Sequence, residues 1–348
     1  MVQLLPTPEE WRRLYDAAIR IKNEIPWESI KQTDIFGVQF PETNEIGFVS
    51  VTGALGEHFS ITVYLGTAGL YGFYDLLQDY MPGNPERLLE IPQLQVSFEN
   101  RLQLDERDRE IIKLLGLKFR GRHAWPMFRS FSPGYFPWFL DMKEVAFLAT
   151  VLEQTLNVIP RYMKDPSIFP SENDNRHFIR THTGSQGGPR WRDTLMELPP
   201  PEAVTMSIPV DGDLLEEVAR IPPIDGILEL DLFLFPATIQ EESERPYYPY
   251  MFLVVDNPSG LVVGSELLKV ETTLQDMWCE IPETFIQMIS DWGAFPRHLS
   301  VKNSFLLDLF MPLMKDLGLA IKQSDEMPLL ERAKETLIES LRIGREPV

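Results

Sequence analysis

Residues 252–264 read FLVVDNPSGLVVG, two apolar runs on either side of the short polar segment DNPSG at 256–260. Apolar and β-branched runs favour strands, and Asn, Pro, Ser and Gly between them favour a tight turn. The stretch therefore predicts a β-hairpin that pairs 250–255 with 261–267. The apolar run at 227–235, which includes LELDL at 228–232, predicts a further strand before the hairpin.

The chain after the hairpin alternates helical and strand patterns. Helices are predicted at 273–292, 305–317 and 328–341, with short strands at 298–301 and 319–322, and another helix at 213–220 precedes the first strand. Gly318 supplies a C-terminal stop for the second of these helices. Three strands followed by alternating helices and strands predict an α/β domain with a mixed sheet.

This order of elements resembles the RNase H-like core of transposases and retroviral-type integrases. The resemblance implies a three-layer α/β domain with a mixed sheet, and it identifies Asp231 with the first-strand aspartate that binds magnesium in active enzymes. Residues 296–304, PRHLSVKNS, resemble the fourth strand, where the family has a second aspartate followed by Asn-Gly. Here those three positions are Lys302, Asn303 and Ser304.

The lysine changes the chemistry that the resemblance implies. Two-metal hydrolysis needs converging carboxylates, and an ammonium group in place of one of them repels a divalent cation. We therefore expect a degenerate acidic site made by Asp231, Asp256, Asn303 and Glu331, with no bound metal and no cofactor. Glu331 and Glu335 lie near the position of the family's third carboxylate, but acids four residues apart are also typical of a solvated helix face.

The N-terminal half predicts a separate mixed α+β domain over 1–165. A helix begins at the Thr7 cap, strands follow at 46–52, 58–65 and 94–98, and helices are predicted at 70–80, 105–115 and 141–158. Residues 166–204 are rich in Pro, Ser, Asn and Gly, which favours a linker carrying a hairpin of 177–183 with 191–197. The α/β domain then covers 205–348.

The whole chain also resembles a family of bacterial two-domain proteins of unknown function. The motifs that carry this likeness are DIFGV at 34–38, YLG at 64–66, GLKFRG at 116–121 and WP at 125–126. The resemblance implies no activity.

Two windows contain no acidic residue and supply candidate anion-binding arginines. The first lies between Glu110 and Asp141, and it combines aromatic rings with Arg120, Arg122 and Arg129, as a single-strand nucleic-acid binder would. The second, 175–192, places Arg180, Arg190 and Arg192 around the Gly-rich segment 184–188. In both windows we favour the simpler alternative, in which the rings belong to the core, the arginines pair with acids and the second window is a tethered hairpin.

Composition restricts the classes of function. The chain has 348 residues, with 52 acidic against 32 basic side chains and a net charge of −20. This excess disfavours a surface that grips nucleic acid or anionic lipid throughout. A single cysteine, Cys279, allows no intrachain disulfide, and the N-terminus has no secretory pattern, so we expect a cytoplasmic protein that does not cross a membrane.

These observations favour a non-enzymatic binding or adaptor protein whose partner is another protein. Two alternatives remain open. One is a divergent metal-dependent nuclease that uses Asp231, Asp256 and the late glutamates. The other is a single-strand nucleic-acid binder that uses Arg120, Arg122, Arg190 and Arg192.

Overall fold

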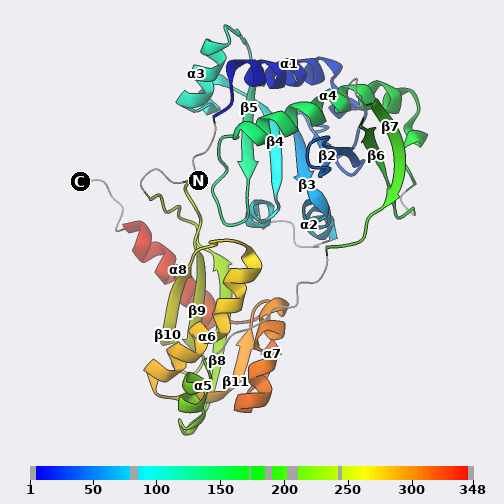
Figure 1. Cartoon of the computed structure of the whole chain (residues 1–348). Coiled ribbons are helices and arrows are strands. Elements are labelled where there is room, and N and C mark those ends of the chain that lie inside the picture. Colours follow the sequence, from blue (N-terminus) through cyan, green and yellow to red (C-terminus); the bar gives the residue numbers. More distant parts are fainter. Residues whose placement is uncertain are drawn as a thin grey trace. The chain divides into compact units, whose positions relative to one another are not determined.

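The computed structural model describes residues 5–78, 85–171, 174–184, 190–201, 211–241 and 245–343. The chain divides into two compact units (Figure 1), the first made of 1–132 and 137–202 and the second of 133–136 and 203–348. Each unit consists of helices packed on one mixed β-sheet. The protein is therefore of the mixed α/β class, as the sequence predicted. Within the described residues, none of the helices has the length and apolar character needed for a bilayer crossing.

The first unit is built on a seven-stranded sheet of order β5-β4-β3-β2-β1-β6-β7. The strands β1 and β6 are parallel, and the other neighbours are antiparallel. The strand bounds are β1 (Phe36–Gln39), β2 (Ile46–Thr52), β3 (Ser60–Leu65), β4 (Gln93–Glu99), β5 (Trp125–Phe131), β6 (Arg176–Thr183) and β7 (Arg190–Glu197).

Helices cover both faces of this sheet. The two long helices α1 (Pro8–Glu24) and α4 (Met142–Lys164) pack on one face, α2 (Gly66–Gln78) packs on the other, and α3 (Glu106–Leu114) precedes β5. Thr7 with Glu10 and Asp141 with Glu144 form capping boxes that fix where α1 and α4 begin.

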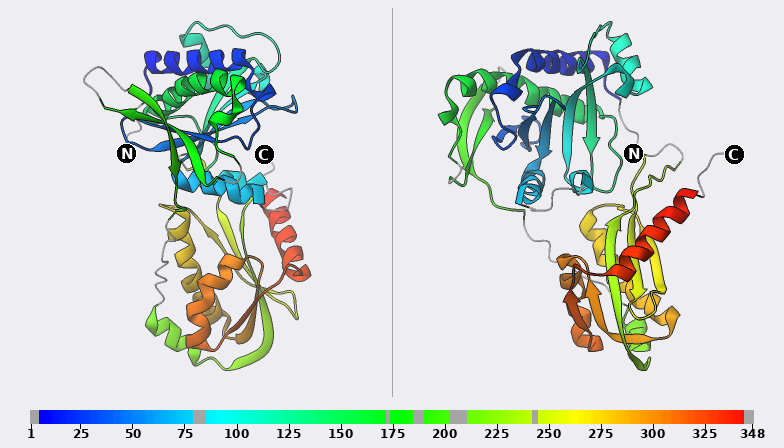
Figure 2. Two further views of the ribbon diagram at one scale, coloured as in Figure 1. Left: turned by 90° about the vertical axis from the view of Figure 1, so that its right-hand side faces the viewer. Right: turned by 180° about the vertical axis from the view of Figure 1, so that it is seen from behind.

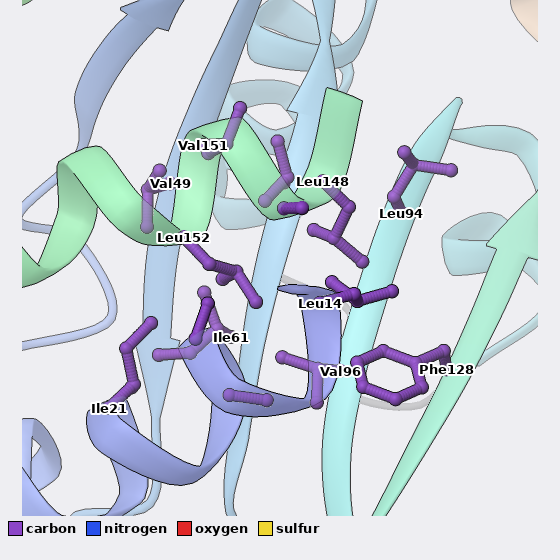
Figure 3. Packing of buried hydrophobic residues seen from close by; sticks show 14 of the residues in the cluster. Leu14, Ile21, Val49, Ile61, Leu94, Val96, Phe128, Leu148, Val151 and Leu152 are labelled. Atoms are coloured by element: carbon purple, nitrogen blue, oxygen red, sulfur yellow. The ribbon is translucent and has the colours of Figure 1, made fainter. Parts of the chain in front are cut away.

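The apolar stripes of α1 and α4 meet the strands in one large core (Figure 3). Leu14 and Ile21 come from α1, and Leu148, Val151 and Leu152 come from α4. They pack against apolar side chains of the strands β2, β3 and β4 and of the edge strand β5: Val49, Ile61, Leu94, Val96 and Phe128. These residues are nearly or fully buried, so the hydrophobic effect holds both helices on this face.

The segment 176–197 is part of this sheet, so the prediction that it belongs to a linker is wrong. The predicted hairpin does form, with His177 opposite Met196 and His182 opposite Trp191. Its first strand, however, also pairs in parallel with β1 through Ile179, which is fully buried. The Pro, Ser, Asn and Gly residues that suggested a linker lie outside the two strands of the hairpin, whereas Phe178 and Ile179 enter the two cores of the unit.

Two strands were not predicted. β1 spans only four residues, too few to show a clear alternation. β5 lies within the first window of cations and aromatic rings, from which the candidate anion-binding residue Arg129 came. Burial alternates only from Trp125 to Phe128, where Phe128 enters the core, and Arg129 and Ser130 are buried as well.

The second unit has a five-stranded sheet of order β10-β9-β8-β11-β12. The pairs β10–β9 and β9–β8 are antiparallel, whereas β8–β11 and β11–β12 are parallel. The mixed sheet confirms the predicted α/β class of this unit. The bounds are β8 (Pro223–Leu234), β9 (Tyr250–Asp256), β10 (Val262–Leu268), β11 (Phe295–Val301) and β12 (Ala320–Gln323), with helices α5 (Gly212–Ala219), α6 (Leu274–Trp292), α7 (Ser304–Leu317) and α8 (Pro328–Ile343).

Successive residues of β9 point to opposite layers. Phe252 contacts the ring of Phe310 from α7, which in turn packs against Phe285 from α6. Leu253 belongs instead to the cluster that contains Leu330 of α8. The sheet thus lies between α6 and α7 on one face and α8 on the other, as the two views of Figure 2 show.

Four residues from the β5–α4 connection belong to the second unit. Tyr135 forms an antiparallel bridge with Tyr247, and the Tyr248 amide donates to the Gly134 carbonyl at 2.8 Å. Gly134 has a φ of +78°, and a Cβ atom there would lie 2.5 Å from Cγ2 of the buried Val270. This site therefore requires glycine for two reasons, its backbone conformation and the space available.

We expect Gly134→Ala to destabilise the second unit by about 2–4 kcal/mol, the sum of a left-handed backbone cost and an overpacking cost. Gly293→Ala is the matched control, because Gly293 has a φ of +69° but a Cβ atom there would have no neighbour within 4 Å. It should lose only the backbone part, about 1 kcal/mol. Urea unfolding of the full chain measures both, and equal losses would show that the contact with Val270 contributes nothing.

Candidate functional site

The candidate site lies where α8 crosses β8. Glu229, Asp231 and Phe233 are two residues apart on β8 and therefore share one face of the sheet. Both acids are buried, with only 3% and 2% of their surface exposed. Buried carboxylates are costly unless they are paired and hydrogen-bonded, so their partners decide what this site can do.

Both carboxylate oxygens of Asp231 have a donor from this chain. Lys334 Nζ of α8 lies 3.3 Å from Oδ2. Asn303 Nδ2 donates to Oδ1 at 3.2 Å and also to the Leu232 carbonyl at 3.2 Å. Asp231, Asn303 and Lys334 thus form a closed polar cluster at the ends of β8 and β11 and on the last helix.

Burial makes the charged form of Asp231 unfavourable, and nearby cations offset this cost. Burial raises the pKa of this carboxyl above its ordinary value, and the Lys334 ammonium opposes that rise. Lys302 also lowers the pKa, and Glu331 raises it. The ammonium of Lys334 lies 3.8 Å from the centre of the Phe233 ring, so a cation–π contact helps hold it over β8.

Glu229 anchors the beginning of α8. Its Oε2 accepts the Leu330 amide at 3.1 Å, and its Oε1 accepts from the Asn257 side chain. A carboxylate at this position satisfies a free helix amide and faces the positive end of the helix dipole. Glu229 is therefore a cap for α8, and it fixes the register that brings Lys334 to Asp231.

Lys302 has a different role from the predicted one. Its ammonium lies 2.8 Å from Oε1 of Glu331 and donates to the Asp325 carbonyl at 3.0 Å. The sequence predicted that Lys302 would supply the cation at the degenerate site, but the cation in contact with Asp231 is Lys334. Glu331 is therefore held by Lys302, and Glu335 is exposed, in keeping with a solvated helix face.

Asp256 does not join this cluster, so its predicted place in the acidic site is wrong. In the β8–β9 register Asp231 lies opposite Leu253, whereas Asp256 lies opposite Leu228. A shift of three residues places its side chain on the other face of the sheet. Asp256 instead accepts the Ser259 amide at 3.2 Å and the Ser259 hydroxyl, which stabilises the turn before β10. In the described part of the chain, no three His, Cys, Asp or Glu side chains are grouped as metal ligands.

Two of the predicted anion-binding arginines are buried in intramolecular pairs. Arg129 binds both oxygens of Asp108, at 2.9 and 2.7 Å, and also contacts Asp105. Arg180 contacts Asp193 at 2.8 Å and Gln154 at 3.0 Å. These two arginines are 8% and 7% exposed, so the simpler alternative, that they pair with acids, is the correct one for them.

The other four predicted arginines are exposed: Arg120, Arg122, Arg190 and Arg192. The first two lie in the loop after α3, but the rings near them belong to the core, where Phe119 packs against Trp125 with ring centres 5.6 Å apart. Arg190 and Arg192 lie on β7, and residues 185–188 of the Gly-rich segment lie outside the described residues.

Sequence reasoning missed Glu229 and Lys334. A signal for the first was present, since two acids at alternate positions of an otherwise apolar strand must face a partner. Nothing in the spacing of α8 distinguishes Lys334 from its neighbours, because its role depends on the angle at which the helix crosses the strand.

We expect Lys334→Met to destabilise the second unit by about 2–3 kcal/mol at neutral pH, because it leaves the buried Asp231 charge unpaired. The loss is smaller than for a fully buried pair because 26% of the Lys334 side chain is exposed. A carboxyl whose pKa is raised by folding costs stability as the pH rises through that pKa. The deficit should therefore shrink as the pH falls and Asp231 becomes protonated. Unfolding curves at several pH values measure this, with the exposed Lys322→Met as control, and a deficit independent of pH would contradict it.

Comparisons with known proteins match two separate regions of the chain to different domain families. Residues 11–180 match a domain of unknown function (DUF7309), and residues 214–338 match a second domain of unknown function (DUF6930). A search of curated proteins found no significant match. Among solved structures, the chain is similar to the HTLV-2 integrase catalytic core domain in complex with magnesium, at 23% identity and a TM-score of 0.25, over 37% of this chain and 81% of that one. The two matched regions, 11–180 and 214–338, thus resemble two separate domain families of unknown function.

Proposed function

We propose that this chain is a non-catalytic binding protein whose second unit keeps an RNase H-like scaffold and has replaced metal ligation by an internal ion pair. The contact between Lys334 and Asp231 is the observation that carries the proposal. A lysine ammonium is a fixed positive charge beside the carboxylate that a divalent cation would need.

The second ligand position supports the same proposal. Asn303 directs its amide N–H toward Asp231 and toward a main-chain carbonyl. A metal ion that entered here would have to displace the ammonium and also turn this amide around. The cluster therefore favours a permanent structural role for Asp231 over ion binding.

The charge of the second unit favours a protein partner over a nucleic-acid substrate. Residues 205–348 contain 11 basic and 25 acidic side chains, a net charge of −14. A nuclease must bring a phosphate backbone to its acidic centre, and this balance opposes that approach. The nuclease alternative further requires Asp256, which lies on the other face of the sheet.

Titration with Mn²⁺ in a calorimeter tests the proposal. The wild-type chain should show no saturable binding up to millimolar Mn²⁺, because Lys334 competes for Asp231. The double variant Asn303→Asp with Lys334→Glu places three carboxylates around the same position and should gain binding. Lys322→Glu, which makes the same charge change as Lys334→Glu at an exposed site, is the matched control and should not.

One outcome of the same titration would contradict the proposal. If the wild-type chain binds Mn²⁺ and Asp231→Asn abolishes that binding, the ion pair yields to metal and the nuclease alternative replaces the proposal.

A further inference from the structure

The strand β7 forms an edge of the seven-stranded sheet, beside β6 (Figure 1). All eight of its residues pair with β6 without a break in register, from Arg190 opposite Thr183 to Glu197 opposite Arg176. Because β6 uses only one side of the strand, the main-chain groups on the other side of β7 point away from the sheet. A long, regular edge of this kind is a template for another strand.

The other sheet edges in the described residues carry features that discourage pairing. Next to β5, Trp138 exchanges two main-chain hydrogen bonds with Ser130, at 2.8 and 2.9 Å. The strand β10 has a register shift between Val262 and Gly264, and β12 spans only four residues. The edge of β7 shows none of these protections over its described length.

Successive residues of a strand point to opposite faces of the sheet, so the charged side chains of the hairpin are divided between two faces. One face carries Arg190, Arg192 and Thr194 from β7, opposite Thr183, Thr181 and Ile179 from β6. Arg192 Nε donates to the Thr181 hydroxyl at 3.3 Å, and neither arginine has an acidic partner among the described residues. The two strands contribute no acid to this part of the face, so it is positive within a chain whose net charge is −20.

On the opposite face, two apolar side chains lie on either side of an aspartate that is paired with arginines. Trp191 and Leu195 point to this face, and 44% of Leu195 is exposed. Asp193 lies between them and is paired with Arg161 and Arg180. A strand added beside β7 would therefore meet cations on one side and apolar surface on the other.

We propose that β7 binds an extended acidic segment of a partner protein by strand addition. Acidic side chains at alternate positions of that segment face Arg190 and Arg192, and the apolar side chains between them face Trp191 and Leu195. The inference goes beyond the proposed function because it names the chemistry of the partner. It concerns a different unit from the Asp231 site, so either proposal can fail without the other.

Other occupants fit this edge less well. Twofold pairing of β7 with a second copy, centred on Arg192 or on Asp193, would place identical charges opposite each other. A nucleic acid would use the two arginines but not the main-chain donors and acceptors of the edge. An acidic peptide uses both.

Fluorescence anisotropy with the full-length chain and a labelled eight-residue peptide that alternates glutamate and valine tests the proposal. We expect saturable binding that a lysine–valine peptide does not show. The double variant Arg190→Glu with Arg192→Glu should weaken binding by at least about tenfold, because it reverses both charges at the edge. The matched control, Arg120→Glu with Arg122→Glu, reverses two exposed charges elsewhere in the same unit and should bind as the wild type does.

A fully N-methylated peptide of the same sequence separates strand addition from charge attraction. It keeps every side chain but has no main-chain donors, and we expect it not to bind. The proposal is overturned if the N-methylated peptide binds as well as the unmodified one, or if the peptide does not bind at all. It is also overturned if sedimentation shows that β7 joins two copies of the chain, or if a labelled oligothymidine binds through Arg190 and Arg192 in place of the peptide.

Discussion

The ion pair between Asp231 and Lys334 compensates a buried charge at the centre of the second unit. A carboxylate that is 2% exposed needs a compensating charge, and the compensation comes from a helix more than a hundred residues later in the chain. The pair therefore ties α8 to the central strand β8. It also places a cation of the protein itself beside Asp231.

The register of α8 on β8 follows from two acids acting together. Glu229 and Asp231 are two residues apart, which spans about 7 Å along a strand, and residues 330 and 334 of α8 are four apart, which spans about 6 Å along a helix. One acid can therefore cap the helix at Leu330 while the other pairs with Lys334. The match in spacing explains how a helix can cover two buried carboxylates without leaving either unpaired.

The succession of strands along the second unit could be predicted from sequence because its strands are apolar runs bounded by strong turn residues. The hairpin 177–183 with 191–197 was predicted for the same reason, but its place in the sheet was not, since pairing with the short β1 has no local signal. At the site, Asp231 and Asn303 were predicted together and are in contact. Lys334 was not predicted, because its role arises from helix packing and not from a motif. Asp256 was misplaced because its face of the sheet depends on the pairing register of β8 and β9, which sets it three positions from the residue opposite Asp231.

In each unit a buried aspartate is paired with a cation of the same chain. Asp108 is held by Arg129, just as Asp231 is held by Lys334, and the exposed Asp193 is held by Arg161 and Arg180. In so acidic a protein most cations are expected to pair with an acid. A cation without an acidic partner is therefore a better candidate for binding another molecule than a paired one. Arg190 and Arg192 lie together on one face of a regular sheet edge, with no acidic partner in the part of the chain that the structure describes. The hairpin is also held by the buried Phe178 and Ile179 and by the contact of Arg180 with Asp193. The pairing of acids with cations that accounts for Lys334 thus leaves Arg190 and Arg192, at the edge of the first unit, as exceptions among the described residues.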